Sequence, residues 1–211
     1  MPTWKEITAA NPQHSENYAQ RWRNFIAQGK DIDGEARLID AIAPRGARIV
    51  DIGCGTGRVA GYLAARGHHL VGTDLDPVLI GYARADFPEV RFEVGDIETE
   101  SVPEGNFDIA VSAGNVMGLL SESGRAGALA NIAAALKPGG RFVVGFGLNR
   151  GWSADDFLAQ ADAAGMTQEH LFESWELDAF GPQSGFLVAF LRRPKVERRD
   201  QVDRKALGNL L

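Results

Sequence analysis

Three aspartates stand where short apolar runs end, and each offers carboxylate oxygens that can bind the polar parts of a small molecule. Asp74 has two acceptor oxygens, which match the vicinal hydroxyls of a ribose; a helix cap is its alternative role, although Asp76 fills that role better. Asp96 could accept a hydrogen bond from an adenine amino group, with a surface turn as the alternative. Asp51 suits an ammonium group better than a pyrophosphate, because like charges repel. The sequence therefore predicts a site for a ribose-containing ligand.

A glycine-rich segment lies between an apolar run and a helix-like segment. Gly53, Gly55 and Gly57 alternate there, so the backbone can turn sharply and a ligand can lie against it, next to the free N–H groups of a helix N-terminus. A nicotinamide-binding loop, G-x-G-x-x-G, would need a glycine at position 58, which is Arg58. Together with Asp51, this departure favours a zwitterionic or cationic ligand. A nicotinamide-dependent oxidoreductase is the least favoured of the functions considered.

The elements that must position these residues follow a βα pattern, which is typical of a doubly wound, mostly parallel sheet. A short polar turn at 181–184 favours an antiparallel hairpin after the parallel strands. Asp76 and Pro77 have the types expected at a helix N-cap and first helical position. The expected strands are 47–52, 69–74, 90–94, 108–113, 141–147, 168–180 and 185–193, and the expected helices are 16–28, 34–42, 57–66, 77–85, 125–136 and 153–164.

Five motifs carry a family resemblance, and they occur in a fixed order between about residues 47 and 147. The chain resembles class I S-adenosylmethionine-dependent methyltransferases, and in particular small stand-alone bacterial-type members. The resemblance implies a Rossmann-like α/β fold with a seven-stranded sheet whose last strand runs antiparallel. The motifs are Asp51-Ile52-Gly53-Cys54-Gly55-Thr56-Gly57, Gly72-Thr73-Asp74-Leu75-Asp76-Pro77, Val94-Gly95-Asp96-Ile97, Phe107-Asp108 and Leu136-Lys137-Pro138-Gly139-Gly140.

The same resemblance implies a role for each cofactor-binding position. Asp51 would face the methionine amino group of S-adenosylmethionine, while Gly53 and Gly55 pass close to the ligand. Asp74 would hold the ribose. The remaining contacts would come from residues that bracket the adenine or close on the methionine part, namely Leu75, Asp96 and Ile97 for the adenine and the backbone near Ala113 for the methionine.

The segment before the first strand is rich in side chains that recognise ligands. If Ser15 caps a helix, Tyr18 and Trp22 lie on one face of it, either against the substrate or sulfonium or packed on the sheet. His14 is a candidate base, although a surface or capping role is the more common one for a lone histidine. Asn115, after the fourth strand, either orients a substrate or stabilises its own loop. We expect a helical lid at 1–46, a methyltransferase core at 47–194 and a charged tail at 195–211.

Composition narrows the function further. The 211 residues carry a net charge of −6, which argues against nucleic-acid binding, and the sequence lacks the motifs of nucleic-acid methyltransferases after the fourth strand. The single cysteine, Cys54, excludes an internal disulfide, and no metal site is expected. No apolar run is long enough for a membrane span, so the expected location is the cytoplasm.

We expect methyl transfer to a small-molecule acceptor; a noncatalytic cofactor-binding or scaffold protein is the alternative, and the oligomeric state stays open.

Overall fold

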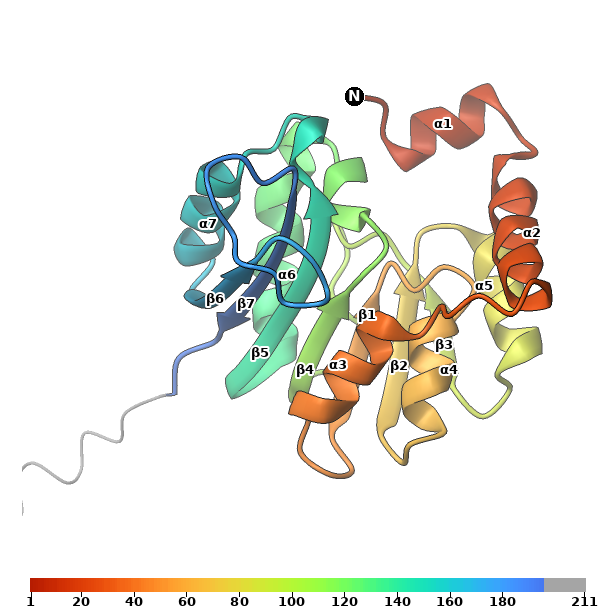
Figure 1. Cartoon of the computed structure of the whole chain (residues 1–211), viewed down its shortest axis with the longest axis horizontal. Helices are drawn as coiled ribbons and strands as arrows, with labels where there is room; N and C mark the ends of the chain where they lie inside the picture. The colour runs from red at the N-terminus through yellow and green to blue at the C-terminus, as the bar shows by residue number, and fades with distance from the viewer. Residues whose placement is uncertain (196–211) are drawn as a thin grey trace, which may run out of the picture.

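Seven strands form one sheet in the computed structural model, which describes residues 1–195 (Figure 1). The strand order is β3-β2-β1-β4-β5-β7-β6. The first five strands run parallel to one another, and β7 is antiparallel to both of its neighbours, so the predicted fold class is confirmed. The strands are β1 (Arg48–Ile52), β2 (His69–Asp74), β3 (Arg91–Val94), β4 (Phe107–Ser112), β5 (Leu136–Gly147), β6 (Thr167–Phe172) and β7 (Phe186–Arg192).

Helices cover both faces of the sheet, and a helical pair stands at its carboxyl edge (Figure 1). The helices are α1 (Trp4–Ala10), α2 (His14–Ala27), α3 (Gly34–Ile42), α4 (Arg58–Ala64), α5 (Pro77–Asp86), α6 (Arg125–Ala135) and α7 (Ala154–Ala163), with short 3₁₀ turns η1 (Val116–Leu119), η2 (Glu122–Gly124) and η3 (Leu148–Arg150). No helix in residues 1–195 is both long and apolar enough to cross a membrane. The predicted charged tail at 195–211 lies outside the described residues, except for Lys195.

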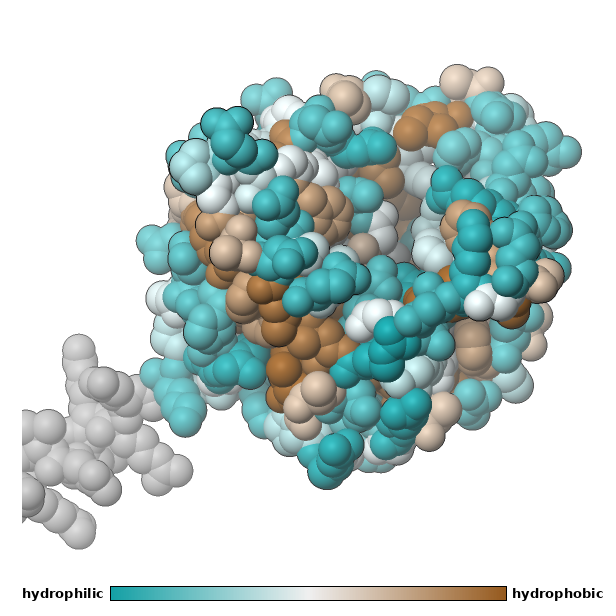
Figure 2. Space-filling model, viewed as in Figure 1, coloured by the Kyte–Doolittle hydropathy of each residue, from teal (hydrophilic) through white to brown (hydrophobic). Residues whose placement is uncertain are grey.

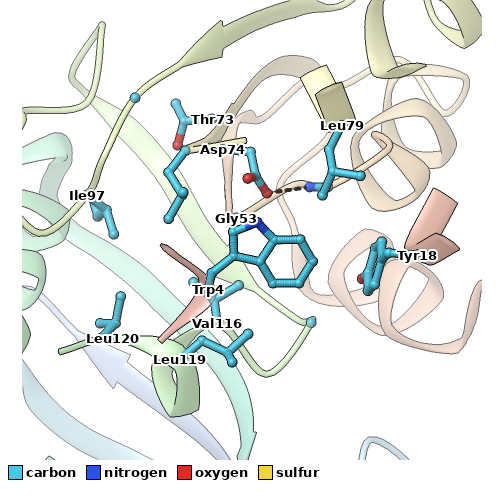
Figure 3. Close-up of a pocket in the computed structure, with 14 residues that line it drawn as sticks. Trp4, Tyr18, Gly53, Thr73, Asp74, Leu79, Ile97, Val116, Leu119 and Leu120 are labelled. Carbon is cyan, nitrogen blue, oxygen red and sulfur yellow. Dashed lines mark hydrogen bonds between the residues drawn. The ribbon is translucent and has the colours of Figure 1, made fainter. Parts of the chain in front are cut away.

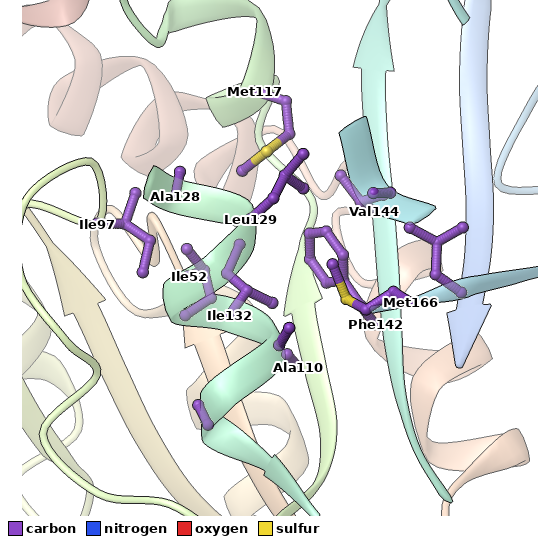
Figure 4. Packing of buried hydrophobic residues seen from close by; sticks show 14 of the residues in the cluster. Ile52, Ile97, Ala110, Met117, Ala128, Leu129, Ile132, Phe142, Val144 and Met166 are labelled. Atoms are coloured by element: carbon purple, nitrogen blue, oxygen red, sulfur yellow. The ribbon is translucent and has the colours of Figure 1, made fainter. Parts of the chain in front are cut away.

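Alternation along the strands divides the core between the two faces. Val50 and Ile52 of β1 point to the face covered by α6 and α7, where they pack in one cluster with Leu129 and Ile132 (Figure 4). Ile49 points the other way, into a cluster formed with α3 and α4. Because both faces are covered, the central strands are apolar almost throughout, as buried parallel strands require.

Two helix boundaries show why the chain changes direction next to the site. Asp76 caps α5, since its carboxylate accepts from the backbone N–H of Val78 at 2.9 Å and of Leu79 at 3.4 Å, and Pro77 is the first helical residue as predicted. The helix expected at 125–136 ends at Ala135, and β5 begins directly afterwards.

Four expectations differ from the structure. The strand expected at 141–147 begins at Leu136, because Leu136 already pairs with Phe107 of β4. The short helix α1 was not expected, because its seven residues show no apolar periodicity. Helix α2 begins at His14, so Ser15 does not cap it; the Ser15 hydroxyl donates to the Asp76 carboxylate instead. The strand expected at 168–180 ends at Phe172, and the chain then forms a turn that leaves the sheet. Trp152 lies in the core, against Phe146 and Phe157.

Candidate active site

Two adjoining cavities open at the carboxyl end of the central strands. The larger has a volume of about 650 Å³ and is bordered by the ends of β1 and β2, while the smaller, about 350 Å³, lies over β1 and β4. Tyr18, Gly53 and Gly114 line both cavities, so together they form one continuous site. This position is the one expected for a ligand of a doubly wound sheet, at the point where the strand order reverses between β1 and β4.

The loop between β1 and α4 has the backbone geometry that the sequence predicts. Gly53, Gly55 and Gly57 have φ angles of 69°, 55° and 81°, a region that other residues rarely adopt. A side chain on Gly53 would also overlap Val116. The backbone N–H of Gly53 donates to the carbonyl of Thr73 at 2.7 Å, which ties the loop to β2. The loop therefore needs glycine both for its shape and for the space beside it.

Asp74 connects this loop to the second strand. Its carboxylate accepts from the backbone N–H of Gly55 at 2.9 Å, the contact drawn in Figure 3, and from that of Asp76 at 2.9 Å. Burial raises the pKa of Asp74 to about 6, although these two hydrogen bonds lower it. Each oxygen keeps further acceptor capacity toward the larger cavity, which Asp74 lines. The prediction that Asp74 holds a ribose fits this geometry.

Asp51 presents a buried carboxylate to the smaller cavity. The residue is only 2% exposed, and its Oδ2 has no hydrogen-bond partner within residues 1–195. Burial raises the pKa of Asp51 to about 7, whereas the nearby Arg58 guanidinium acts in the opposite direction. A buried carboxylate oxygen without a partner is costly unless a ligand completes it. An ammonium group is the ligand that best matches it.

An apolar slot lies on the opposite side of Asp74. It is lined by Leu75, Leu79 and Ile97, and by Gly95, which directly follows β3. The slot suits the flat, apolar faces of a purine ring. Asp96 does not line this cavity; its carboxylate forms an ion pair with Lys5 of α1 and accepts from the backbone N–H of Glu98 at 3.0 Å. Its predicted adenine contact would have to share the carboxylate with Lys5.

The helices α1 and α2 place aromatic side chains over the larger cavity (Figure 3). Trp4 donates its Nε1–H to the Asp76 carboxylate at 2.8 Å, and its ring packs edge-on against Tyr18, with centroids 5.5 Å apart. Burial raises the pKa of Tyr18, so its hydroxyl stays protonated near neutral pH. Tyr18 was predicted and Trp4 was not. The only sequence signal of Trp4 is that an aromatic residue stands in a polar terminal segment.

The other residues predicted to face substrate are distributed around this site. Trp22 and Ala113 line the smaller cavity. His14 packs edge-on against Trp4, with ring centroids 4.9 Å apart, and does not line either cavity. Asn115 has a φ of 62° and accepts from the backbone N–H of Gly147 at 2.7 Å, so it joins the β4 and β5 loops. Its side chain therefore stabilises the loop.

Comparisons with known proteins identify the class. A profile described as a methyltransferase domain matches residues 49–140. A solved TehB-like SAM-dependent methyltransferase from Corynebacterium glutamicum is 59% identical, with a TM-score of 0.84, and the match covers 87% of this chain and 100% of that chain. The chain belongs to the class I S-adenosylmethionine-dependent methyltransferases, and the cofactor of this family is S-adenosylmethionine.

Curated relatives show how varied the chemistry of similar chains is. A magnesium-protoporphyrin O-methyltransferase of Rhodobacter capsulatus is 32% identical over 52% of this chain and 48% of its own length. The S-adenosyl-L-methionine-dependent Diels-Alderase iccD of Talaromyces variabilis is 34% identical over 66% of this chain and 50% of its own. The chain thus spans half or less of these relatives, and their names do not fix its acceptor.

The residues of the site fit S-adenosylmethionine on chemical grounds. The unpartnered oxygen of Asp51 matches the ammonium group, the free acceptor capacity of Asp74 matches the ribose hydroxyls, and the slot at Leu75 and Ile97 matches the adenine. In the part of the chain that the structure describes, no group of three or more His, Cys, Asp or Glu side chains could hold a metal ion.

Proposed function

We propose that this protein transfers a methyl group from S-adenosylmethionine to a small-molecule acceptor. The observation that carries the proposal is the pair of carboxylates at one continuous site: Asp51 with an unpartnered oxygen in the smaller cavity, and Asp74 facing the larger one. In this arrangement Asp51 binds the ammonium group and Asp74 the ribose, while Leu75, Ile97 and the backbone of Gly53, Gly55 and Ala113 bracket the rest of the cofactor.

The chemistry requires positioning more than acid–base catalysis. When bound, S-adenosylmethionine supplies an activated methyl group whose leaving group is a neutral thioether. The protein's own task is to hold the acceptor in line with that methyl group and to exclude water. Trp4 and Tyr18 perform the second part by covering the cavity, and their aromatic faces attract the positive charge of a sulfonium.

A small acceptor is favoured by what surrounds the opening. Helices α1 and α2 border the site, which is a hollow between elements (Figure 2) lined mainly by apolar and aromatic side chains rather than by the basic residues that a nucleic acid would need. The net charge of −6 supports the same conclusion. A base at His14 and a cytoplasmic location stay predictions, and neither a scaffold role nor a nicotinamide-dependent reaction has a specific observation in its favour.

The test is product formation. The purified protein is incubated with S-adenosylmethionine and a collection of small hydroxylated, amino and thiol compounds, and mass spectrometry follows S-adenosylhomocysteine together with a methylated product. We expect both products to form in equal amounts with at least one acceptor, and to fall strongly with Asp74→Ala. If S-adenosylhomocysteine never exceeds the level without protein, although the protein binds the cofactor, the proposed transferase function is wrong.

A further inference from the structure

A third cleft lies directly beside the smaller cavity, on the side away from the adenine slot. It has a volume of about 780 Å³, and Trp22 and Phe25 of α2, Glu35 of α3 and Trp175 of the β6–β7 connection are among its lining residues. We call it the aromatic cleft. Trp22 also lines the cavity that contains Asp51, so one indole stands between the aromatic cleft and the cofactor site.

The sheet register places this cleft next to the reacting end of the site. Asp51 of β1 is paired with Val111 of β4, which is paired with Val143 of β5. Val111 and Val143 face α3, and Gly145, two residues further along β5, faces the same way. Trp175 packs on Gly145. It therefore lies near the carboxyl end of β5, on the same face of the sheet as Asp51 and two strands away from it.

Trp175 packs on β5 but has no ring partner among residues 1–195. A Cβ on Gly145 would lie 2.5 Å from Cζ2 of Trp175, so the indole rests on a place where β5 carries no side chain. The connection is shaped by Ser174, whose hydroxyl accepts from the backbone N–H of Glu176 at 3.1 Å and donates to Asp178 at 2.8 Å. No aromatic ring or cation within residues 1–195 stacks on Trp175, which is partly exposed.

The charges around the aromatic cleft balance one another. Glu35 is paired with Arg58 at 2.9 Å and Asp31 with Arg37 at 2.6 Å, and Lys30 and Glu176 add one charge of each sign. The rings on the α2 side already carry cations: Arg58 lies 4.6 Å from the Trp22 centroid and Lys30 lies 4.3 Å from that of Phe25. Hydrophobic side chains gather on this face over β5 and the adjoining connection (Figure 2). A ligand here meets aromatic rings bordered by charged side chains whose charges cancel, so the surroundings carry no net charge.

We propose that the aromatic cleft is the acceptor site and that the acceptor is a neutral, planar aromatic compound stacked on Trp175. This inference rests on the proposed function. A hydroxyl or amine on the ring reaches past Trp22 toward the methyl group. The acceptor's lone pair forms the bond to the methyl carbon, the carbon–sulfur bond breaks with its electrons going to sulfur, and the acceptor's proton passes to water. Stacking on an indole selects planar rings over saturated rings of the same size.

The experiment measures binding to the full chain by calorimetry, in the presence of saturating S-adenosylhomocysteine. The probes are 2-naphthol, which is neutral and planar, and decahydro-2-naphthol, which has the same skeleton without aromaticity. The variants are Trp175→Ala, Trp175→Phe and, as a matched control, Leu177→Ala; Leu177 lies in the same connection, is 42% exposed and does not line the cleft. The affinity for S-adenosylhomocysteine is measured for every variant.

We expect 2-naphthol to bind the wild-type protein about fivefold more tightly than decahydro-2-naphthol, because ring stacking contributes about 1 kcal/mol beyond area burial. Trp175→Ala should weaken 2-naphthol by about tenfold, whereas Trp175→Phe and Leu177→Ala should change it by less than about threefold. Equal affinity for the two probes, an unchanged affinity in Trp175→Ala, or no binding of 2-naphthol by protein that binds S-adenosylhomocysteine would each overturn the inference. If S-adenosylhomocysteine itself fails to bind, the proposed function is wrong and this inference falls with it.

Discussion

Asp51 is the residue whose environment is hardest to explain without a ligand. Its side chain is buried, one carboxylate oxygen has no partner in the described part of the chain, and its pKa is raised to about 7. Ionisation of such a group lowers the stability of the free protein. A ligand ammonium would remove that cost, so the residue links cofactor binding to stability.

Replacing Asp51 with Asn should therefore stabilise the free protein at high pH. The folded-state pKa is raised above the ordinary value of 3.8, so this group's contribution to stability is fully present below about pH 4 and is lost as pH rises to about 7. Asn mimics the protonated form. We expect the melting temperature of Asp51→Asn to exceed that of wild type by several degrees, roughly 2–4 °C per kcal/mol, at pH 8 and to match it near pH 4. Melting temperatures that differ equally at both pH values would contradict this assignment.

The affinity for cofactor should show the opposite dependence on pH. Binding an ammonium group requires ionised Asp51, so the affinity for S-adenosylhomocysteine should rise between pH 6 and pH 8, by up to about tenfold per pH unit below the pKa. Calorimetry at several pH values checks the slope. Asp51→Asn should bind weakly with little slope in this range, and a wild-type affinity that is flat with pH would show that Asp51 does not meet the ammonium.

Asp74→Ala should weaken cofactor binding by about 10- to 100-fold, because hydrogen bonds to a charged acceptor are worth roughly 1.5–3 kcal/mol each. The cofactor affinity of Asp74→Asn, which keeps one acceptor oxygen, should lie between those of Asp74→Ala and the wild type. Circular dichroism controls for the loss of the hydrogen bond from Gly55. An unchanged calorimetric affinity in a folded Asp74→Ala protein would remove the ribose assignment.

At the scale of elements, α1 is the part of the site least anchored to the rest of the molecule. It has no fully buried residue, and it is held by the Trp4–Asp76 hydrogen bond and the Lys5–Asp96 ion pair. Asp76 also receives Ser15, so one helix cap joins α1, α2 and α5. We propose that α1 acts as a lid, which can open for the ligand without disturbing the sheet because few contacts attach it.

Trp4→Ala and Tyr18→Ala should accordingly reduce cofactor affinity or turnover more than they reduce stability. We expect a loss of about tenfold or more in kcat/KM with a fall of only a few degrees in melting temperature. Thr8→Ala is the matched control, because Thr8 lies on α1, bonds only to backbone carbonyls and does not line the cavity. A large fall in melting temperature with normal kinetics would assign both aromatic residues to packing instead.

The connection between β6 and β7 shows where local patterns mislead. Apolar residues continue after Phe172 in an alternation that predicts a longer strand, but Ser174 bonds to the backbone two and four residues on. Such local hydrogen bonds compete with a sheet ladder. Leu177 then adopts a φ of 68°, which a strand does not allow. This departure from the strand leaves Trp175 free to pack on Gly145.

For the whole molecule, the succession of strands and helices along the chain, the glycine loop and the two central carboxylates could be predicted because local sequence determines them. The βα alternation and the spacing of Gly53, Gly55 and Asp74 are properties of short segments. A lid at 1–46 was predicted, but the contact of Trp4 with the site was not, since Trp4 reaches Asp76 across 72 positions in the chain. Contacts of that kind depend on the assembled fold.

The most direct test of the account is a calorimetric titration of the full chain with S-adenosylmethionine, S-adenosylhomocysteine and NADH under identical conditions. We predict micromolar binding of the first two, none of NADH, and a strong loss of both affinities in Asp74→Ala. Binding of NADH alone, or of none of the three compounds by folded protein, would contradict the conclusion that this site holds S-adenosylmethionine.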